Sequence, residues 1–192
     1  MALNGFTPKT AKHLQLDAGI LVKNHTIGSE IVEANKLGAT SGGSTFSAVP
    51  TIRSIFEDLD GSRGNYKDGN VIDSWDITLS ATVKEVTAEN IKLALGSADS
   101  QAGIDTEAKY DVVTPRNDIK TADYLTNLCW IGTVNGSDEF MIIELKNVLN
   151  TNGFSFTATD KGTGAVALEL KAHFDLNKPD EVPFKIYVPK EA

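Results

Sequence analysis

One short run of the sequence matches a cofactor-binding pattern. Residues Gly162–Ala167 read Gly-Thr-Gly-Ala-Val-Ala, which has the spacing of the dinucleotide fingerprint. That fingerprint works where it follows a strand and opens a helix, because the phosphates bind at the helix N-terminus. Here the run leads instead into alternating apolar and polar residues, which are typical of a strand. We therefore expect no bound cofactor.

The residue types that bind metals or carry catalysis do not converge in the sequence. The chain has three histidines, His13, His25 and His173. They include no His-x-x-x-His pair. The run Asp58–Gly61 resembles the start of a calcium loop, but Arg63 stands where the loop needs glycine and Gly69 stands where it needs glutamate. The chain also lacks a nucleophile elbow and a phosphate-binding loop. We expect no metal site, no catalytic residues and no enzymatic activity.

The composition is that of one acidic globular domain. The 192 residues include 26 Asp and Glu against 18 Lys and Arg, a net charge of −8. Nucleic-acid binders usually carry a basic face, so this balance argues against conventional DNA or RNA binding. No apolar run is long enough to span a bilayer, and the first residues lack the pattern of a secretory signal. The single cysteine, Cys129, lies in an apolar run and is predicted to be a buried, inert thiol in a reducing cytoplasm.

Period-two alternation is the strongest structural signal. Apolar residues occupy the odd positions of 75–84 and the even positions of 164–176. Each pattern predicts a strand with one face on the core and one on water. The polar positions are Asp76, Thr78, Ser80, Thr82 and Lys84 in the first strand and Glu169, Lys171 and Asp175 in the second. A hairpin is predicted from 126–134 and 139–148, because the Asn135-Gly136 pair between them tolerates positive φ. Shorter strands are predicted at 19–23, 45–56 with a break at Pro50, 110–114, 154–159 and 183–188.

One helix is predicted at about 87–96. Thr87 is suited to the N-cap, Glu89 complements the helix N-terminus and Gly96 is suited to the C-cap. The apolar residues Ile91, Ala94, Leu95 and Ala98 follow helical spacing.

Two long stretches, 24–43 and 57–70, are predicted to be loops, because they combine turn residues with few apolar ones. Residues 1–16 and 177–192 are predicted to be an N-terminal and a C-terminal arm. The chain is therefore expected to be a single, mainly β domain with one helix, long loops and extended ends. Open sheets have edges that must be covered or paired, and another subunit can do this.

The order of these segments resembles that of phage tail tube proteins. The glycine-rich stretch Leu37–Pro50 resembles the entry to their first long strands, and Val86–Gly96 resembles their single helix. Trp130–Gly132, Leu145–Thr157 and His173–Tyr187 are similar to later segments of the same family. The chain is most similar to the major tail proteins of long-tailed phages that infect Gram-positive bacteria.

This resemblance implies a fold, an assembly and a set of partners. The fold would be two packed β-sheets, sandwich- or barrel-like, with a flanking helix. Six subunits would close a ring in which the inner strands join into a continuous barrel, and rings would stack into a hollow tube. The implied partners are further copies of the chain and the tape-measure, tail tip and tail terminator proteins. Double-stranded DNA would pass through the lumen without specific binding, and no membrane would be involved. The protein would assemble in the host cytoplasm and reside in the virion tail.

The polar strand faces are then candidates for the lumen wall, with an outer solvent face as the alternative. A wall of net negative sign would repel DNA weakly and keep it from stalling. The loop 57–70 is the candidate contact between stacked rings, where the alternative is a mobile surface loop. It offers charge pairs and one aromatic anchor through Asp58, Asp60, Arg63, Tyr66 and Lys67.

Other functions fit parts of the pattern. The same fold builds the inner tube of contractile tails, of tailocins and of a bacterial secretion apparatus. A monomeric β-barrel that binds a small molecule would need an apolar interior cavity. An enzyme with a β-sandwich fold would need the catalytic residues that the sequence lacks.

Overall fold

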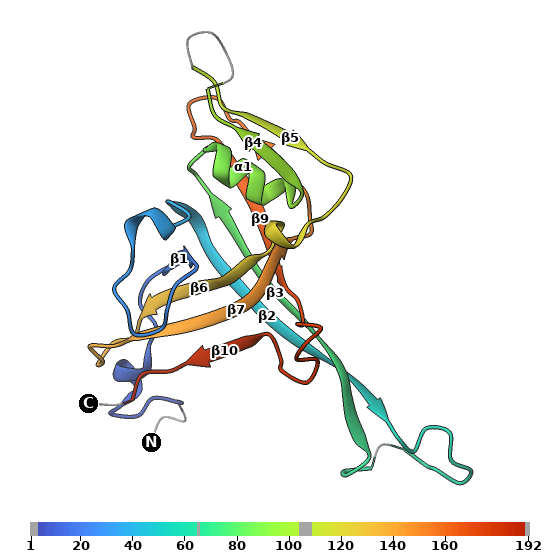
Figure 1. Ribbon diagram of the computed structural model, residues 1–192. Helices are drawn as coiled ribbons and strands as arrows, with labels where there is room; N and C mark the ends of the chain where they lie inside the picture. Colours follow the sequence, from blue (N-terminus) through green and yellow to red (C-terminus); the bar gives the residue numbers. More distant parts are fainter. Residues whose placement is uncertain (1–3, 65, 104–108, 191–192) are drawn as a thin grey trace.

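The computed structural model describes residues 4–64, 66–103 and 109–190. The protein is mainly β, as predicted, with one α-helix (Figure 1). The strands are β1 (Ile20–Lys23), β2 (Thr40–Ser54), β3 (Asn70–Val83), β4 (Ala98–Gln101), β5 (Val112–Pro115), β6 (Leu125–Thr133), β7 (Phe140–Asn150), β8 (Ser155–Thr157), β9 (Ala165–Ala172) and β10 (Phe184–Tyr187). The helices are α1 (Ala88–Leu95) and three short 3-10 turns, η1 (Thr10–His13), η2 (Glu33–Asn35) and η3 (Thr121–Asp123).

Eight strands form one antiparallel sheet that divides into two layers. The order is β1-β6-β7-β9-β3-β2, with β10 paired to β7 and β8 paired to β9. Only Val148–Asn150 of β7 pair with β9, so the link between the two halves is narrow. The Phe184 ring of β10 lies 5.6 Å from the Phe46 ring of β2 and 5.8 Å from the Trp75 ring of β3. We call β1, β6, β7 and β10 layer A, and β2, β3, β8 and β9 layer B.

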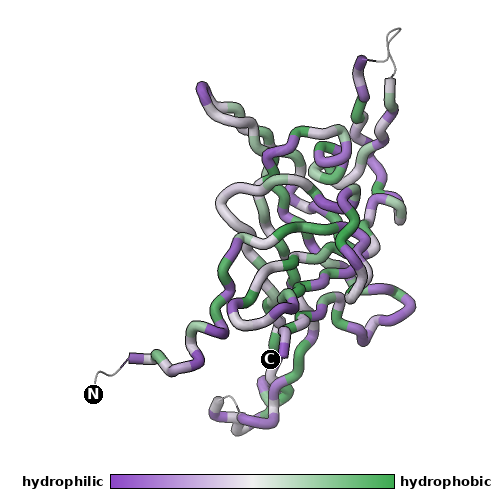
Figure 2. Tube along the Cα trace, turned by 90° about the vertical axis from the view of Figure 1, so that its left-hand side faces the viewer, coloured by the Kyte–Doolittle hydropathy of each residue, from purple (hydrophilic) through white to green (hydrophobic). Residues whose placement is uncertain are grey.

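The core lies between the two layers and contains the predicted apolar faces. Ile77 and Leu79 of β3 and Leu168 and Leu170 of β9 are buried there. Apolar stretches accordingly run through the body of the molecule (Figure 2). Burial of a large aliphatic side chain stabilises the fold by about 1.5–3 kcal/mol. The alternation is therefore the main determinant of which side of each strand faces the core.

The second alternating strand is shorter than predicted. β9 ends at Ala172, and the side chain of Leu176 is 97% exposed. The chain turns away because the Asp175 carboxylate accepts a hydrogen bond from the Asn177 N–H at 2.9 Å. The Lys178 N–H closes the same turn on the Asp175 carbonyl. Local side-chain bonding of this kind competes with the strand ladder.

The outer face of layer A is also covered. Cys129 and Ile131 of β6 pack there with Val22 of β1, and Ile27 and Ile31 from the segment after β1 lie over them. The prediction that Cys129 is buried is confirmed. Burial, with the nearby Glu144 charge, raises the pKa of its thiol to about 12, so the thiol stays protonated and inert.

The predicted loop 24–43 extends too far, since β2 begins at Thr40. Gly42 and Gly43 lie inside the strand at φ +81° and +79°, where the register shifts between Ser41 and Ser44. Only glycine adopts this conformation without strain, so the residues that suggested a loop instead form a bulge.

The predicted break at Pro50 is absent, because β2 continues through it and ends at Ser54, two residues before the predicted end. Proline lacks an N–H, and an edge strand tolerates it because one side of the strand has no partner. With β3 it forms a long hairpin that extends away from the body of the molecule (Figure 1). The predicted loop 57–70 is the tip of this hairpin, apart from Asn70, which already belongs to β3.

Helix α1 is capped as predicted. The Thr87 hydroxyl accepts a hydrogen bond from the Asn90 N–H at 3.1 Å, and Gly96 ends the helix at φ +72°. Ala98 was assigned to the apolar face of the helix, but it is buried in β4. The two-stranded β4–β5 sheet lies beside α1 (Figure 1).

The two predicted arms are partly attached to the domain. Residues 184–187 of the C-terminal segment form β10 and pair with β7 in the main sheet. In the N-terminal segment Gln15 forms a bridge with Val134. The strand predicted at 183–188 is therefore confirmed, and it lies within the segment predicted as the C-terminal arm.

Candidate functional site: a polar sheet face and a projecting hairpin

Layer B exposes a polar face on the side opposite the core. The register places Thr78 beside Lys171 and Ser80 beside Glu169, with Ser47 and Thr45 of β2 on their other side. Cross-strand partners point to the same side of a sheet, so one face gathers the polar positions of all four strands. We call this surface the hydroxyl face; its hydroxyl residues are Thr45, Ser47, Thr51, Ser74, Thr78, Ser80, Thr82, Ser155 and Thr157.

The charges on the hydroxyl face balance. Asp76 and Glu169 are acidic, Lys171 is basic, and Lys84 follows directly after β3 at the border of the face. The Lys171 ammonium lies 2.5 Å from the Asp76 carboxylate. This face therefore has no net negative charge, contrary to the expected sign of a repelling wall. The acidic excess of the chain lies elsewhere.

Asp175, predicted to share a face with Glu169 and Lys171, lies apart from them. It follows the end of β9 and lines a groove on layer A together with Asn127, Glu144 and Lys146. The early end of β9 accounts for the difference, because the two-residue period does not continue past Ala172. The other predicted positions, Asp76, Thr78, Ser80, Thr82, Glu169 and Lys171, share the hydroxyl face.

The groove on layer A contains a buried carboxylate whose partners are structural. Glu144 accepts hydrogen bonds from the Tyr187 hydroxyl at 3.0 Å and from the Asn127 amide at 3.2 Å. Burial and this bond to Glu144 both raise the pKa of Tyr187. Lys146 pairs with Glu181 at 2.7 Å. These contacts attach β10, the segment before it and β6 to β7. The groove offers no paired nucleophile and base for catalysis.

Layer B ends in two borders that are open in a single subunit. β2 runs for fifteen residues along one border, and no other strand of the described residues pairs with its outer side. The three-residue β8 forms the other border beside β9. A long exposed edge of this kind is a template for pairing with another chain.

The tip of the β2–β3 hairpin is organised by an aromatic pair. The rings of Phe56 and Tyr66 meet edge to face at 5.4 Å, and the Tyr66 hydroxyl accepts a hydrogen bond from the Arg63 N–H at 3.3 Å. Phe56, Leu59 and Tyr66 line an open apolar pocket. Of the charged candidates, Asp60 and Lys67 also line this pocket. Asp58 does not line it but is exposed like them.

The shaft of the hairpin exposes apolar side chains that sequence reasoning did not single out. Ile52 and Ile72 are cross-strand partners and are 57% and 50% exposed. Val49 is exposed on the opposite side of β2. Val49 and Ile52 lie in the predicted strand 45–56, whereas Ile72 lies between the predicted loop 57–70 and the alternating run 75–84. Neither pattern reveals that the two strands continue beyond the core.

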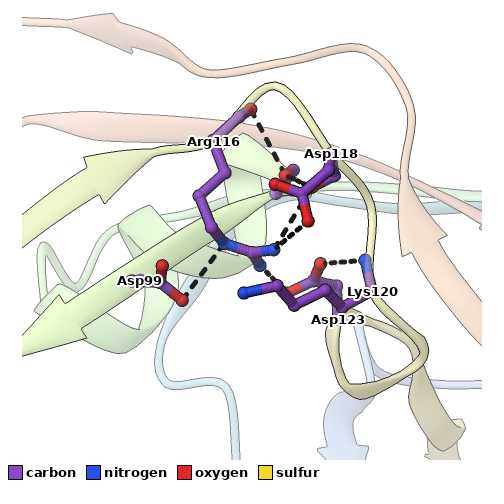
Figure 3. A network of polar contacts seen from close by, with 6 residues as sticks. Asp99, Arg116, Asp118, Lys120 and Asp123 are labelled. Atoms are coloured by element: carbon purple, nitrogen blue, oxygen red, sulfur yellow. Dashed lines mark hydrogen bonds and ion pairs between the residues drawn. The ribbon is translucent and has the colours of Figure 1, made fainter.

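A second polar cluster surrounds Arg116 near α1 (Figure 3). Its guanidinium lies 2.5 Å from the Asp123 carboxylate, 3.1 Å from that of Asp99 and 3.5 Å from that of Asp118. Burial alone would raise the pKa of Asp123, but the Lys120 N–H and Arg116 outweigh burial and lower it. The cluster joins β4, β5 and η3, so its role is to hold the small sheet in place.

Neither the comparison with known proteins nor the search for metal-binding side chains assigns a function to these surfaces. No protein-family model matches the chain, and no curated protein sequence matches it. In the described part of the chain, no group of three or more His, Cys, Asp or Glu side chains is placed to hold a metal ion. None of the described helices is both long and apolar enough to cross a membrane.

Proposed function

We propose that this protein is a structural subunit of a phage tail tube, in which hexameric rings stack into a hollow conduit for DNA. The observation that carries the proposal is layer B, which combines a polar outer face with two open borders. Joining β2 of one copy to the β8 border of the next would cover β8 and part of β2 and close the layers into a ring. The hydroxyl face then lines the lumen.

The dimensions of such a ring suit an aqueous conduit. Six copies of a four-stranded layer give about 24 strands, more than the 16–18 strands of porins that already leave a water-filled channel. At a spacing of about 4.8 Å between strands, the circumference is roughly 115 Å and the diameter about 37 Å before strand tilt widens it. A lumen lined by side chains on such a barrel has room for a DNA duplex.

The β2–β3 hairpin is suited to contact between rings. Its shaft carries Ile52 and Ile72 beyond the core, and its tip carries Leu59 and Tyr66 around an apolar pocket. Apolar residues gathered on a projecting element are typical of a surface that is buried in an assembly. In this proposal the tip packs on the neighbouring ring, and Asp58, Asp60, Arg63 and Lys67 form charge pairs there.

The proposed partners follow from this role. They are other copies of the chain, the tape-measure protein inside the tube, and the tail tip and terminator proteins at its ends, all within the virion. The inner tube of a contractile tail, a tailocin or a secretion apparatus would use the same surfaces. A monomeric small-molecule binder is less well supported, because the space between the layers is filled by buried side chains such as Leu79, Leu168 and Leu170.

Maleimide labelling tests which face lines the tube. Cys129 is buried and inert, so any labelling of these variants can be assigned to the introduced cysteine. We expect Thr78→Cys, on the hydroxyl face, to react with a 5 kDa polyethylene glycol maleimide before assembly and to be protected afterwards. Val32→Cys, in the exposed segment that covers layer A, should react in both states. Equal labelling of both variants in assembled particles would contradict a luminal hydroxyl face.

A further inference from the structure

We propose that Asp76 masks Lys171, so that the middle of the hydroxyl face presents no available cation to a polyanion. This inference rests on the proposed function and concerns how DNA slides past the wall without binding. The face is rich in hydroxyl groups, and Lys171 is the one basic residue in the middle of it. An available lysine at this position would be repeated in every copy of a ring.

The geometry places the masking carboxylate on the neighbouring strand. Asp76 and Lys171 project from β3 and β9 to the same side, and their charged groups lie 2.5 Å apart. The side chain of Lys171 is 39% exposed, so solvent and a passing polyanion have access to it. An ion pair that is this exposed to solvent adds little to the free energy of folding. Its main physical effect is that the Asp76 carboxylate compensates the charge of the Lys171 ammonium.

Glu169 provides a contrast on the same face. It lies two residues before Lys171 on β9 and points to the same side, and none of the ion pairs among the described residues involves it. Removing the charge of Glu169 or of Asp76 changes the net charge of the face equally. Only the change at Asp76 releases the lysine ammonium.

Duplex DNA carries about one negative charge per 1.7 Å of its axis, so released lysines in successive rings would meet phosphates all along the wall. Each phosphate neutralised by a lysine contributes about −0.9 to the slope of log affinity against log salt concentration. Between 50 and 200 mM salt, this corresponds to roughly a 3.5-fold change in affinity for each phosphate contacted. Binding of this kind would slow the passage of DNA.

The test is fluorescence anisotropy with a labelled 30-base-pair duplex, titrated with each variant at 50 and at 200 mM salt. We expect Asp76→Asn to bind the duplex more tightly than the unchanged protein at 50 mM salt, by at least about threefold, and with a steeper salt dependence. Glu169→Gln should change the affinity much less. Adding Lys171→Gln to Asp76→Asn should remove the gain.

Equal gains for Asp76→Asn and Glu169→Gln would overturn the inference, because net charge and not masking would then control binding. A gain that persists in the Asp76→Asn/Lys171→Gln double variant would also overturn it. The contrast between variants is measured on the unassembled fraction isolated by size-exclusion chromatography, because the face is exposed in a free subunit. Electron microscopy of the same samples before this separation reports separately on tube formation, so failure of the proposed function is distinguishable from failure of this inference.

Discussion

Removing the hairpin tip should leave a folded subunit that no longer forms tubes. In this variant residues 58–68 are deleted and Phe56-Glu57 is replaced by Asn-Gly. The Ile55 N–H already donates to the Gly69 carbonyl at 2.8 Å, so a two-residue turn closes the same register. We expect the melting temperature to stay within about 5 °C of the unchanged protein, because the removed residues lie outside the core. Sedimentation velocity should show monomers, and electron microscopy should show no tubes.

A point variant separates loss of contact from any effect of shortening the hairpin. Leu59 and Val32 are both 56% exposed, and both lie in long connecting segments. We expect Leu59→Asp to fold normally and to assemble poorly, and Val32→Asp to assemble as the unchanged protein does. Tubes of normal length from the deletion variant would contradict the assignment of the hairpin tip to the contact between rings.

The largest expected loss of stability follows from replacing Asn150 by alanine. This side chain is 4% exposed and links three segments of the chain. Its amide donates to the Ala94 carbonyl at 2.5 Å and to the Gly153 carbonyl at 3.0 Å, and its oxygen accepts from the Glu169 N–H at 2.8 Å. Truncation leaves buried backbone groups without partners, each at a cost of about 1–3 kcal/mol.

We therefore expect Asn150→Ala to lower the free energy of unfolding by about 2–4 kcal/mol, measured by urea denaturation followed by circular dichroism. Asn152→Ala is the matched control, because Asn152 is exposed two residues away in the same turn. Its effect should stay within about 0.5 kcal/mol. Similar values for the two variants would contradict the structural role of the Asn150 amide.

Much of the fold could be predicted from the sequence, because its strongest signals are local. The alternation in 75–84 and 166–172 determines which side chains meet the core, and the burial of Ile77, Leu79 and Leu168 confirms it. Thr87 and Gly96 delimit the helix for reasons contained within a few residues. Patterns of this kind can be interpreted from a few neighbouring residues, without knowing which distant segments pack against them.

The errors concern features that depend on distant partners. The glycine-rich start of β2 was predicted to be a loop, but pairing with β3 turns the glycines into a bulge. The strand at 183–188 was predicted, but its partner β7 was not, because the two strands are distant in the sequence. Asn150 and Arg116 were missed for the same reason, because the groups that they bond come from other segments.

The candidate surfaces were predicted in part. The polar positions of β3 and β9 do share one face, but their balance of charge became visible only when Asp175 was placed on layer A and Asp76 beside Lys171. The hairpin tip was singled out from its composition. The exposed pair Ile52 and Ile72 on its shaft was not, because a strand pattern does not reveal where the core beneath it ends.

Negative-stain electron microscopy across a concentration series, beside a sizing column, tests the central claim most directly. The account predicts rings or hollow tubes of uniform width, with an apparent size that grows with protein concentration and six subunits in each ring. Purified tail tips, added as nuclei, should promote growth if free subunits assemble slowly. A uniform 20.6 kDa monomer at every concentration, with tail tips present as well, would contradict the account.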